Sequence, residues 1–413
     1  MWKLRFERVK KIKIFNDPIY GFISVNSELI FKLIEHPYFQ RLRRISQMGL
    51  SYLVYPGAHH TRFHHALGCG FLMKKAIETL RQKDIEISKK EEEALYIAIL
   101  LHDLGHGPFS HALENSIVEN MTHEEISLKF MEFLNKEFNG ELSLAIKIFT
   151  GKYHREFMHQ LISSQLDMDR LDYLKRDSFY SGVAEGNINA ERLITMLYVK
   201  NDSLVIEGKG IYSVEKFIVA RRLMYWQVYL HKTGLAAESV LVKILQRARE
   251  LIGKGVDLPS SKLLKHFLNT FIDVNSFDDK ELDLFSKLDD FDVISALKLW
   301  VDHDDFVLSY LSKSIINRKL PKVMMQVHDF SDEFKGRLEN KILDKYPIYK
   351  EDLKYLLFGG KVKNQAYNTD AEQINILYKN GDIKDIANAS DNLSIQALSK
   401  TVTKYFICYP KNL

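Results

Sequence analysis

The residues best suited to do chemistry lie between Ile99 and His111, where an apolar run ends in His102-Asp103 and continues as Leu-Gly-His-Gly-Pro-Phe-Ser-His. An apolar helix that ends in an imidazole and a carboxylate leaves costly polar groups in a core unless a metal ion, a partner or water satisfies them. The simpler alternative is that His102 and Asp103 only cap the end of the helix.

Two further segments carry residues of the same chemistry. His65 stands at the head of an apolar stretch that reaches Leu80, and a run of charged residues begins at Asp169. In that run Asp169 and the residues at i+4, i+7 and i+8 share one helical face, which would carry carboxylates, a phenol and a guanidinium. The members of this face are Asp169, Tyr173, Arg176 and Asp177.

The order H…HD…D resembles the metal site of the HD-domain phosphohydrolases. Longer motifs in the same order are Asn16-Asp-Pro-Ile-Tyr-Gly21, Gln47-Met-Gly49, Arg62-Phe-x-His65-x-Leu-Gly68, His102 to His111, Thr122-His-Glu124 and Asp169-x-x-Asp-Tyr-x-x-Arg-Asp177. Together they are similar to the deoxynucleoside triphosphate (dNTP) triphosphohydrolases of this class. The resemblance is dense from Lys13 to Gly182, thinner to Lys232 and weak beyond.

The resemblance implies a divalent metal ion held by His65, His102, Asp103 and Asp169. Two imidazoles and two carboxylates suit Fe, Mn, Zn, Co or Ni better than Ca, and Mg is retained as a candidate. Such a site keeps positions open for water and for a phosphate oxygen.

Four further residues would act on the phosphates by the same resemblance. His111 is the candidate general acid, His106 and His123 would contact the α-phosphate, and Glu114 would orient His123. The residues expected to bind the rest of the nucleotide are Gln47, Arg62, Arg170, Tyr173, Asp177, Arg221 and Tyr229. Asp177 would repel phosphate, so it belongs at the sugar hydroxyl.

A regulatory nucleotide site between subunits is also implied, together with a nucleotide activator and a homo-oligomer, a dimer or a tetramer. The residues that map to it are Lys13, Asn16, Glu35, Gln40 and Arg43. Glu35 departs from the family pattern, because the human member has Asp at that place.

The most favoured function is hydrolysis of dNTPs to deoxynucleoside and tripolyphosphate. One alternative is another HD-type nucleotidase or phosphodiesterase that uses the same metal site. The other is a nucleotide-binding or nucleic-acid-binding protein with residual activity, although the complete ligand set disfavours an inactive site.

The composition limits the remaining choices. The chain has 413 residues, of which 46% are hydrophobic, and a net charge of only +4, so a large core is expected and nucleic-acid binding is not indicated. Two cysteines, Cys69 and Cys408, do not suggest a disulfide framework. With no apolar run long enough to span a membrane, we expect a soluble cytoplasmic protein.

The elements that position these residues are expected to be mainly α: an HD-domain helical core with small β-hairpin insertions and a C-terminal α+β subdomain. Periodicity and capping residues predict helices at 27–36, 38–48, 65–81, 88–103, 110–120 and 123–138, and a long helix from Ser213. Arg41, Arg43 and Arg44 are expected to point outward. Turn signals predict hairpins around residues 16–21, 201–202 and 380–381, and a terminal strand at 402–409. The expected divisions are 1–48, 49–255 and 256–413.

Overall fold

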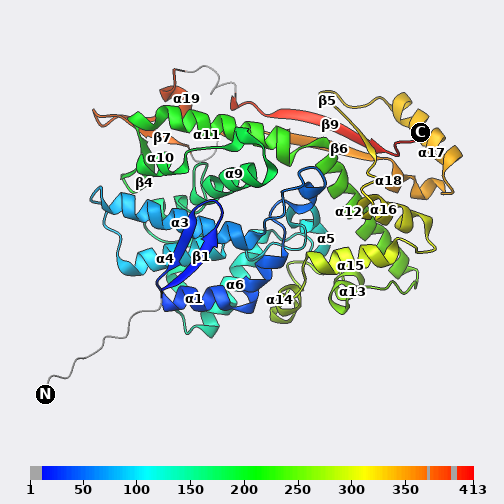
Figure 1. Ribbon diagram of the computed structural model, residues 1–413, viewed down its shortest axis with the longest axis horizontal. Helices are drawn as coiled ribbons and strands as arrows, with labels where there is room; N and C mark the ends of the chain where they lie inside the picture. The colour runs from blue at the N-terminus through cyan, green and yellow to red at the C-terminus, as the bar shows by residue number, and fades with distance from the viewer. Residues whose placement is uncertain (1–11, 370–372, 392–397) are drawn as a thin grey trace.

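The structure is a computed structural model that describes residues 12–369, 373–391 and 398–413. Within residues 110–117, the side chains of His111, Ala112, Glu114 and Asn115 lie outside the description. The described chain is mainly α with small sheets, as predicted (Figure 1). In that part of the chain, no helix is long and apolar enough to cross a membrane.

Three helices form the frame of the molecule: α3 (Arg62–Arg81), α4 (Lys89–Leu101) and α9 (Met168–Ser181). Helix α4 begins where Ser88 and Glu91 form a reciprocal capping box, and its buried residues continue to Leu101, next to His102. The Asp167 side chain caps α9 by accepting from the Arg170 amide at 2.7 Å. The predicted metal ligands therefore lie at the end of α4 and in the first turn of α9.

The other helices surround this frame. Among them the N-terminal half contributes α1 (Glu28–Glu35), α2 (Pro37–Gln40), α5 (Glu114–Ile117), α6 (His123–Glu137), α7 (Ser143–Phe149), α8 (Glu156–Gln160) and α10 (Ala190–Thr195). The later helices are α11 (Ile211–Met224), α12 (Lys232–Gly253), α13 (Lys262–Asn269), α14 (Asp279–Phe285), α15 (Asp290–Trp300), α16 (Phe306–Ile316), α17 (Asp332–Lys345), α18 (Leu353–Leu356) and α19 (Ile386–Ala389).

The strands form three small sheets. The predicted hairpin β1 (Lys13–Asp17) and β2 (Gly21–Val25) is antiparallel. The hairpin β3 (Leu197–Lys200) and β4 (Ser203–Glu207) joins β7 (Asn375–Leu377) and β8 (Ile383–Asp385) through parallel pairing of β4 with β7. The third sheet has the order β5 (Lys322–Gln326), β9 (Val402–Tyr409), β6 (Phe358–Asn364) and runs along one edge of the molecule (Figure 1). The predicted hairpin around residues 380–381, which is β7 and β8, thus extends the sheet that β3 and β4 form earlier in the chain. The proposed domain boundaries stay a prediction.

Two predicted helices are shorter than expected. The segment predicted as one helix over 38–48 consists of α2 and a 3-10 turn (Arg41–Arg44), after which Ser46 pairs with Thr61 in an extended bridge. Arg41 does not point outward: it is fully buried, and its guanidinium donates to the carbonyl oxygens of Leu288 and Leu104. These carbonyls bind two of the three guanidinium nitrogens of a side chain that periodicity alone would place in solvent.

The segment predicted as a helix over 110–120 is likewise shorter, because a 3-10 turn (Ser110–Leu113) precedes α5 and the chain is extended again at Val118. The long helix after Gly210 is interrupted by a π-helical turn at Tyr225–Tyr229, before α12 begins. Such turns often mark functional sites.

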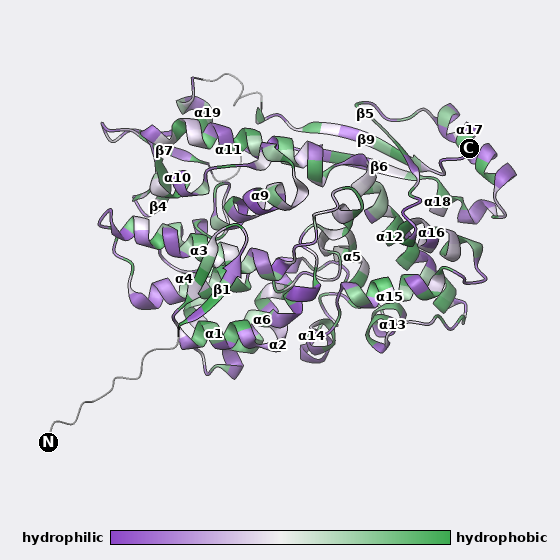
Figure 2. Ribbon diagram, in the orientation of Figure 1, coloured by the Kyte–Doolittle hydropathy of each residue, from purple (hydrophilic) through white to green (hydrophobic). Residues whose placement is uncertain are grey.

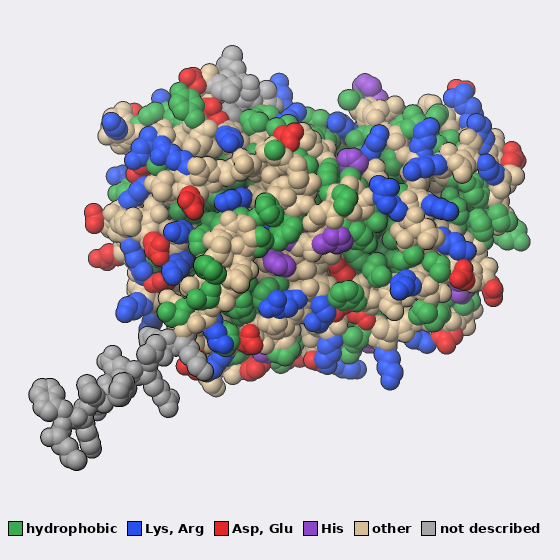
Figure 3. All heavy atoms as spheres, in the orientation of Figure 1, with side chains coloured by type: hydrophobic (Ala, Val, Ile, Leu, Met, Phe, Trp, Pro, Cys, Tyr) green, Lys and Arg blue, Asp and Glu red, His purple; other side chains and the backbone are tan. Residues whose placement is uncertain are grey.

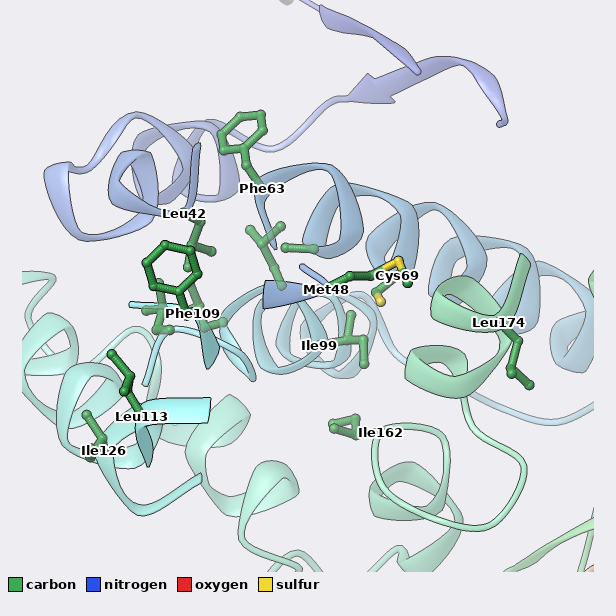
Figure 4. Packing of buried hydrophobic residues seen from close by; sticks show 14 of the residues in the cluster. Leu42, Met48, Phe63, Cys69, Ile99, Phe109, Leu113, Ile126, Ile162 and Leu174 are labelled. Atoms are coloured by element: carbon green, nitrogen blue, oxygen red, sulfur yellow. The ribbon is translucent and has the colours of Figure 1, made fainter. Parts of the chain in front are cut away.

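One continuous core joins these elements, and apolar residues line the inner faces of the helices (Figure 2). Phe109, in the loop after α4, is 2% exposed and lies near Leu42 and Leu113 (Figure 4). Charges of both signs are scattered over the face drawn in Figure 3. The core therefore continues under the loop that carries the predicted catalytic residues.

Candidate active site

The four predicted metal ligands converge from α3, the end of α4 and the first turn of α9. Asp169 Oδ1 lies 3.0 Å from His65 Nε2 and 3.6 Å from His102 Nε2. Asp103 completes the set, with Oδ2 3.6 Å from His65 Nε2 and Oδ1 3.3 Å from His102 Nε2. Residues more than a hundred positions apart in the chain thus present two imidazole nitrogens and two carboxylates to one point.

The second nitrogen of each imidazole is engaged by a neighbour. His65 Nδ1 lies 2.8 Å from Asp172 Oδ2, and His102 Nδ1 donates to the Ile99 carbonyl at 2.6 Å. Contacts of this kind fix the ring orientation and the tautomer of metal-binding histidines, so that the lone pair of Nε2 is left to bind a metal ion. Asp172 is fully buried and was not predicted as a site residue, although it stands in the Asp169-x-x-Asp motif.

The donor set fits a divalent cation. His102 Nε2 is buried and makes no hydrogen bond to any described group, although a polar nitrogen in such a place requires a partner. Burial lowers the pKa of His102, but Asp103 and Asp169 outweigh it and raise the pKa; at His65 burial is likewise outweighed, by Cys69, Asp169 and Asp172, and the pKa is raised. A metal ion would satisfy the unpaired nitrogen and the carboxylates together.

Cys69 also lies in this cluster and was not predicted. Its sulfur and the donor atoms of His65, His102 and Asp169 all lie within 4.8 Å of one another. Burial raises the pKa of the thiol, and Sγ is 3.5 Å from both nitrogens of His65. A neutral thiol in this position packs against the imidazole ring; its spacing of four residues from His65 on one helix could have indicated the contact.

Asp103 links the metal cluster to a second group of predicted residues. Its Oδ1 is 3.3 Å from His106 Nε2, and the His106 ring stacks on the His123 ring with centroids 3.9 Å apart. Burial, reinforced by the charge of Arg62, holds the pKa of His106 well below its usual value, so this imidazole is neutral. The structure therefore brings His106 and His123 together, whereas the side chains of His111 and Glu114 lie outside the described residues.

Arg62 is buried against the same carboxylate. Its Nη1 pairs with Asp103 Oδ2, and its Nε donates to Ser110 Oγ at 2.9 Å. The predicted phosphate-binding arginine thus lies directly beside a predicted metal ligand.

The far end of α9 holds a second polar centre around Asp177, which is 3% exposed. Asp177 Oδ1 is 2.7 Å from His60 Nε2, and Tyr229 donates its hydroxyl to Asp177 Oδ2 at 2.8 Å. The buried His60 ring stacks on Tyr180 with centroids 4.3 Å apart. His60 was not predicted; its place two residues before Arg62 was the available signal.

Three further residues predicted to bind the nucleotide, Tyr173, Arg170 and Arg221, lie close to one another. Burial raises the pKa of Tyr173, as do Tyr225 and Asp169, whereas the nearby charges of Arg170 and Arg221 lower it. Arg170 Nη1 is 3.5 Å from the Tyr173 hydroxyl, while Arg221 Nε is buried without a hydrogen bond to a described group. These cations and phenols therefore gather beside the metal cluster.

Gln47 is held next to His60, since its backbone N–H donates to the His60 backbone carbonyl at 3.0 Å. The Gln47 Oε1 atom is buried and has no hydrogen bond to any described group. Arg176, which periodicity places on the same face of α9 as Asp169, instead binds Asp172 and Asp17. The Arg176 guanidinium thus holds Asp172, the residue behind His65.

The residues predicted for a regulatory nucleotide are brought together only in part. Arg43 Nε donates to Gln40 Oε1 at 2.8 Å and its guanidinium lies 3.5 Å from the centre of the Phe63 ring. Lys13 and Asn16 lie three residues apart on β1, so they are on opposite faces of the hairpin. Glu35, at the end of α1, is exposed. This site remains a prediction.

Similarity to known proteins identifies the family. Residues 62–177 match the HD domain, and residues 188–254 match the HD associated region. The chain is 32% identical over 425 residues to the uncharacterized protein YwfO of Bacillus subtilis, covering 98% of this chain and 94% of that one. The crystal structure of a phosphohydrolase from Bacteroides thetaiotaomicron is 50% identical, with a TM-score of 0.94, and the match covers 97% of this chain and 100% of that chain.

The protein therefore belongs to the HD-domain phosphohydrolase family. Among its relatives, human deoxynucleoside triphosphate triphosphohydrolase SAMHD1 is 27% identical over 326 residues, covering 68% of this chain and 50% of that protein. The family and the mainly α fold agree with the sequence-based predictions.

Proposed function

We propose that the protein hydrolyses dNTPs at the α-phosphorus, giving a deoxynucleoside and tripolyphosphate. The observation that carries the proposal is the Asp177 carboxylate, held between His60 and Tyr229 on the helix that also supplies the metal ligand Asp169. Eight residues of helix separate the two carboxylates, about 12 Å along the axis. Residues of one helix can thus contact both the phosphate end and the sugar end of a single nucleotide.

The residues around Asp177 would give the enzyme a preference for deoxyribose over ribose. Asp177 is already shared by two donors but keeps lone pairs for a 3′-hydroxyl, and the unpaired Gln47 Oε1 can take part. The hydrogen bond from Tyr229 to Asp177 fixes its ring, whose centroid is 6.0 Å from that of Tyr173. A ring fixed in this way can pack on C2′ and leave no room for a 2′-hydroxyl.

The phosphate end supplies positive charge. Arg62, Arg170 and Arg221 can hold phosphate oxygens through their guanidinium N–H groups. His106 and His123, whose rings stack, would contact the α-phosphate, as the family resemblance implies. A divalent ion, when bound by His65, His102, Asp103 and Asp169, supplies Lewis acidity toward water and a phosphate oxygen.

The reaction balances with water as the only co-substrate. The water oxygen forms a bond to the α-phosphorus, the bond from phosphorus to O5′ breaks, and O5′ receives a proton. In this proposal His111 delivers that proton, as the family resemblance implies.

Product analysis tests the proposal directly. Each dNTP is incubated with Mn, Mg, Fe or Co, with and without GTP or a second dNTP, and the products are separated by anion exchange. Tripolyphosphate with the free deoxynucleoside supports the proposal. Release of orthophosphate or pyrophosphate would instead assign the metal site to another nucleotidase or phosphodiesterase.

Further parts of the proposal rest on the family resemblance alone. They are a homo-oligomer and a nucleotide activator bound near Gln40 and Arg43. The proposed cytoplasmic location rests on the sequence composition instead.

A further inference from the structure

A carboxylate from the C-terminal part of the chain reaches the active-site loop. Asp290, at the first turn of α15, accepts from the Phe109 amide through Oδ1 and from the Ser46 amide through Oδ2, both at 2.8 Å. Asp290 is 7% exposed, and its two partners precede it by 181 and 244 positions in the chain. One side chain thus joins the loop after α4 to the segment that leads to Gln47.

The loop that Asp290 holds is strained. Phe109 and Ser110 both have φ of 53°, in the left-handed region that residues with a side chain rarely adopt. Such a conformation persists only where its surroundings hold it. The Phe109 ring packs in the core near Leu42 (Figure 4). The backbone N–H of Phe109 donates to the Asp290 carboxylate.

Ser110 connects this loop to the predicted metal site through Arg62. Its hydroxyl donates to the Ser46 carbonyl at 3.0 Å and accepts from Arg62 Nε at 2.9 Å, while Arg62 also pairs with Asp103. Ser46 therefore contacts Asp290 through its amide and Ser110 through its carbonyl. The next residue along the chain is His111.

Asp290 is not needed to begin its own helix. The N-cap of α15 is Asp289, which accepts from the Phe291 amide at 3.0 Å and forms a capping box with Asp292. Both oxygens of Asp290 accept hydrogen bonds from other parts of the chain instead.

We infer that Asp290 is a positioning residue, which holds Phe109 and Ser110 in their left-handed conformation and so places Arg62 for phosphoryl transfer. The catalytic part of this inference rests on the proposed function; the holding of the loop does not. It assigns to the C-terminal segment a role in the active site that the HD domain match, ending at residue 177, does not include.

The test compares Asp290→Asn and Asp290→Ala with Asp289→Asn. The amide of Asp290→Asn places an NH₂ group against one of two backbone donors, so one hydrogen bond is lost, whereas Asp290→Ala loses both. Asp289→Asn keeps a good N-cap and changes a neighbouring carboxylate that contacts neither Ser46 nor Phe109. Each variant is assayed for metal content, kcat and KM on dNTPs, and hydrogen exchange of the peptide that contains Phe109.

We expect Asp290→Asn to lower kcat about tenfold to a hundredfold, as small misplacements of catalytic groups do, and Asp290→Ala to lower it further. KM and metal content should change little, and faster exchange should be confined to the loop around Phe109. Wild-type kcat and protection in Asp290→Asn, or an equal loss in Asp289→Asn, would overturn the inference. If the wild type releases no tripolyphosphate, the proposed function fails, while unchanged exchange in Asp290→Ala separately overturns the role in the loop.

Discussion

Asp172 fixes the ring of His65: its Oδ2 lies 2.8 Å from His65 Nδ1 and accepts from Arg176 Nε, also at 2.8 Å. Arg176 Nη1 in turn donates to Asp17 Oδ2 at 2.7 Å, so the N-terminal hairpin is tied to a predicted metal ligand through three buried charges. Burial raises the pKa of the Asp172 carboxyl, but Arg176 and His65 outweigh it and lower the pKa to about 2. Asp172 therefore stays ionised and keeps Nδ1 of His65 protonated.

The first prediction concerns this contact. Asp172→Asn should weaken metal binding about tenfold to a hundredfold, because a neutral amide raises the basicity of the His65 ring less than a carboxylate does, and its NH₂ group cannot accept from His65 or Arg176. Titration calorimetry with Mn²⁺ measures the loss.

Asp17→Asn is the matched control. It breaks the outer ion pair and leaves the contact between His65 and Asp172 in place, so it should lower stability without changing metal affinity. Equal metal affinity in Asp172→Asn and the wild type would show that this contact does not support the site.

The second prediction separates the ligands from the general acid. Asp169→Ala and His102→Ala should lose both metal and turnover, because each removes one of four donors from a shared site. His111→Ala should keep its metal and lose rate, since its expected role is proton donation. Metal analysis and turnover on the three variants decide this, and full occupancy in either ligand variant would refute the assigned set.

The third prediction concerns stability and pH at the start of α4. Burial raises the pKa of Glu91, but hydrogen bonds from Ser88, Arg155 and Tyr153 outweigh it and lower the pKa to about 2. A carboxylate with a lowered pKa in the folded state stabilises the protein above its ordinary pKa of 4.5, and this contribution is lost as the pH falls toward 2.

Glu91→Gln should therefore lower the free energy of unfolding by about 1–2 kcal/mol at pH 7, a value reduced for solvent screening of the partly exposed Arg155. The difference from the wild type should shrink in urea titrations at pH 3.5. Glu92→Gln, which removes a more exposed ion pair with Arg81, is the control and should cost less at both values. A difference that does not depend on pH would contradict this account.

Local signals were enough to predict most of the elements that carry the site. Ser88 with Glu91 marks the start of α4, and the residues after Leu101 mark its end, so the positions of His102 and Asp103 followed from the sequence. The predicted ligand His65 and the polar face of α9 followed from motif order and helical spacing. These features depend on residues close together in the chain.

The contacts missed from the sequence join residues that are far apart. Arg41 is buried because Leu288 and Leu104 supply carbonyl oxygens, and Asp290 reaches Phe109 from the C-terminal part of the chain. The pairing of β4 with β7 joins residues 206 and 376. Periodicity describes one element at a time, so it contains no information about such partners.

The fourth prediction is that the outer face of the N-terminal hairpin lies in a subunit interface. Ile14 and Phe22 are 59% and 74% exposed and lie on the same face, because they pair with Ser24 and Asn16. Ile14→Asp with Phe22→Asp should shift the protein to a monomer in light scattering at micromolar concentration. Tyr349→Asp, which changes a residue that is 79% exposed elsewhere, is the control. A wild type that is already monomeric and fully active would refute the interface.

The last prediction tests how the pocket excludes ribonucleotides. Tyr229 can act through its ring, which would occupy the space of a 2′-hydroxyl, and through its hydroxyl, which binds Asp177. Steric exclusion in a packed site is worth about 1–3 kcal/mol, roughly tenfold to a hundredfold in rate, so the wild type should hydrolyse dATP faster than ATP by that factor. Tyr229→Ala removes both features and should narrow this ratio, whereas Tyr229→Phe keeps the ring and should preserve it. Because Phe no longer donates to Asp177, Tyr229→Phe should still lose rate on dATP. The ratio of kcat/KM for dATP and ATP in the three proteins decides the matter, and equal rates on both nucleotides in the wild type would remove Tyr229 from the selection of the sugar.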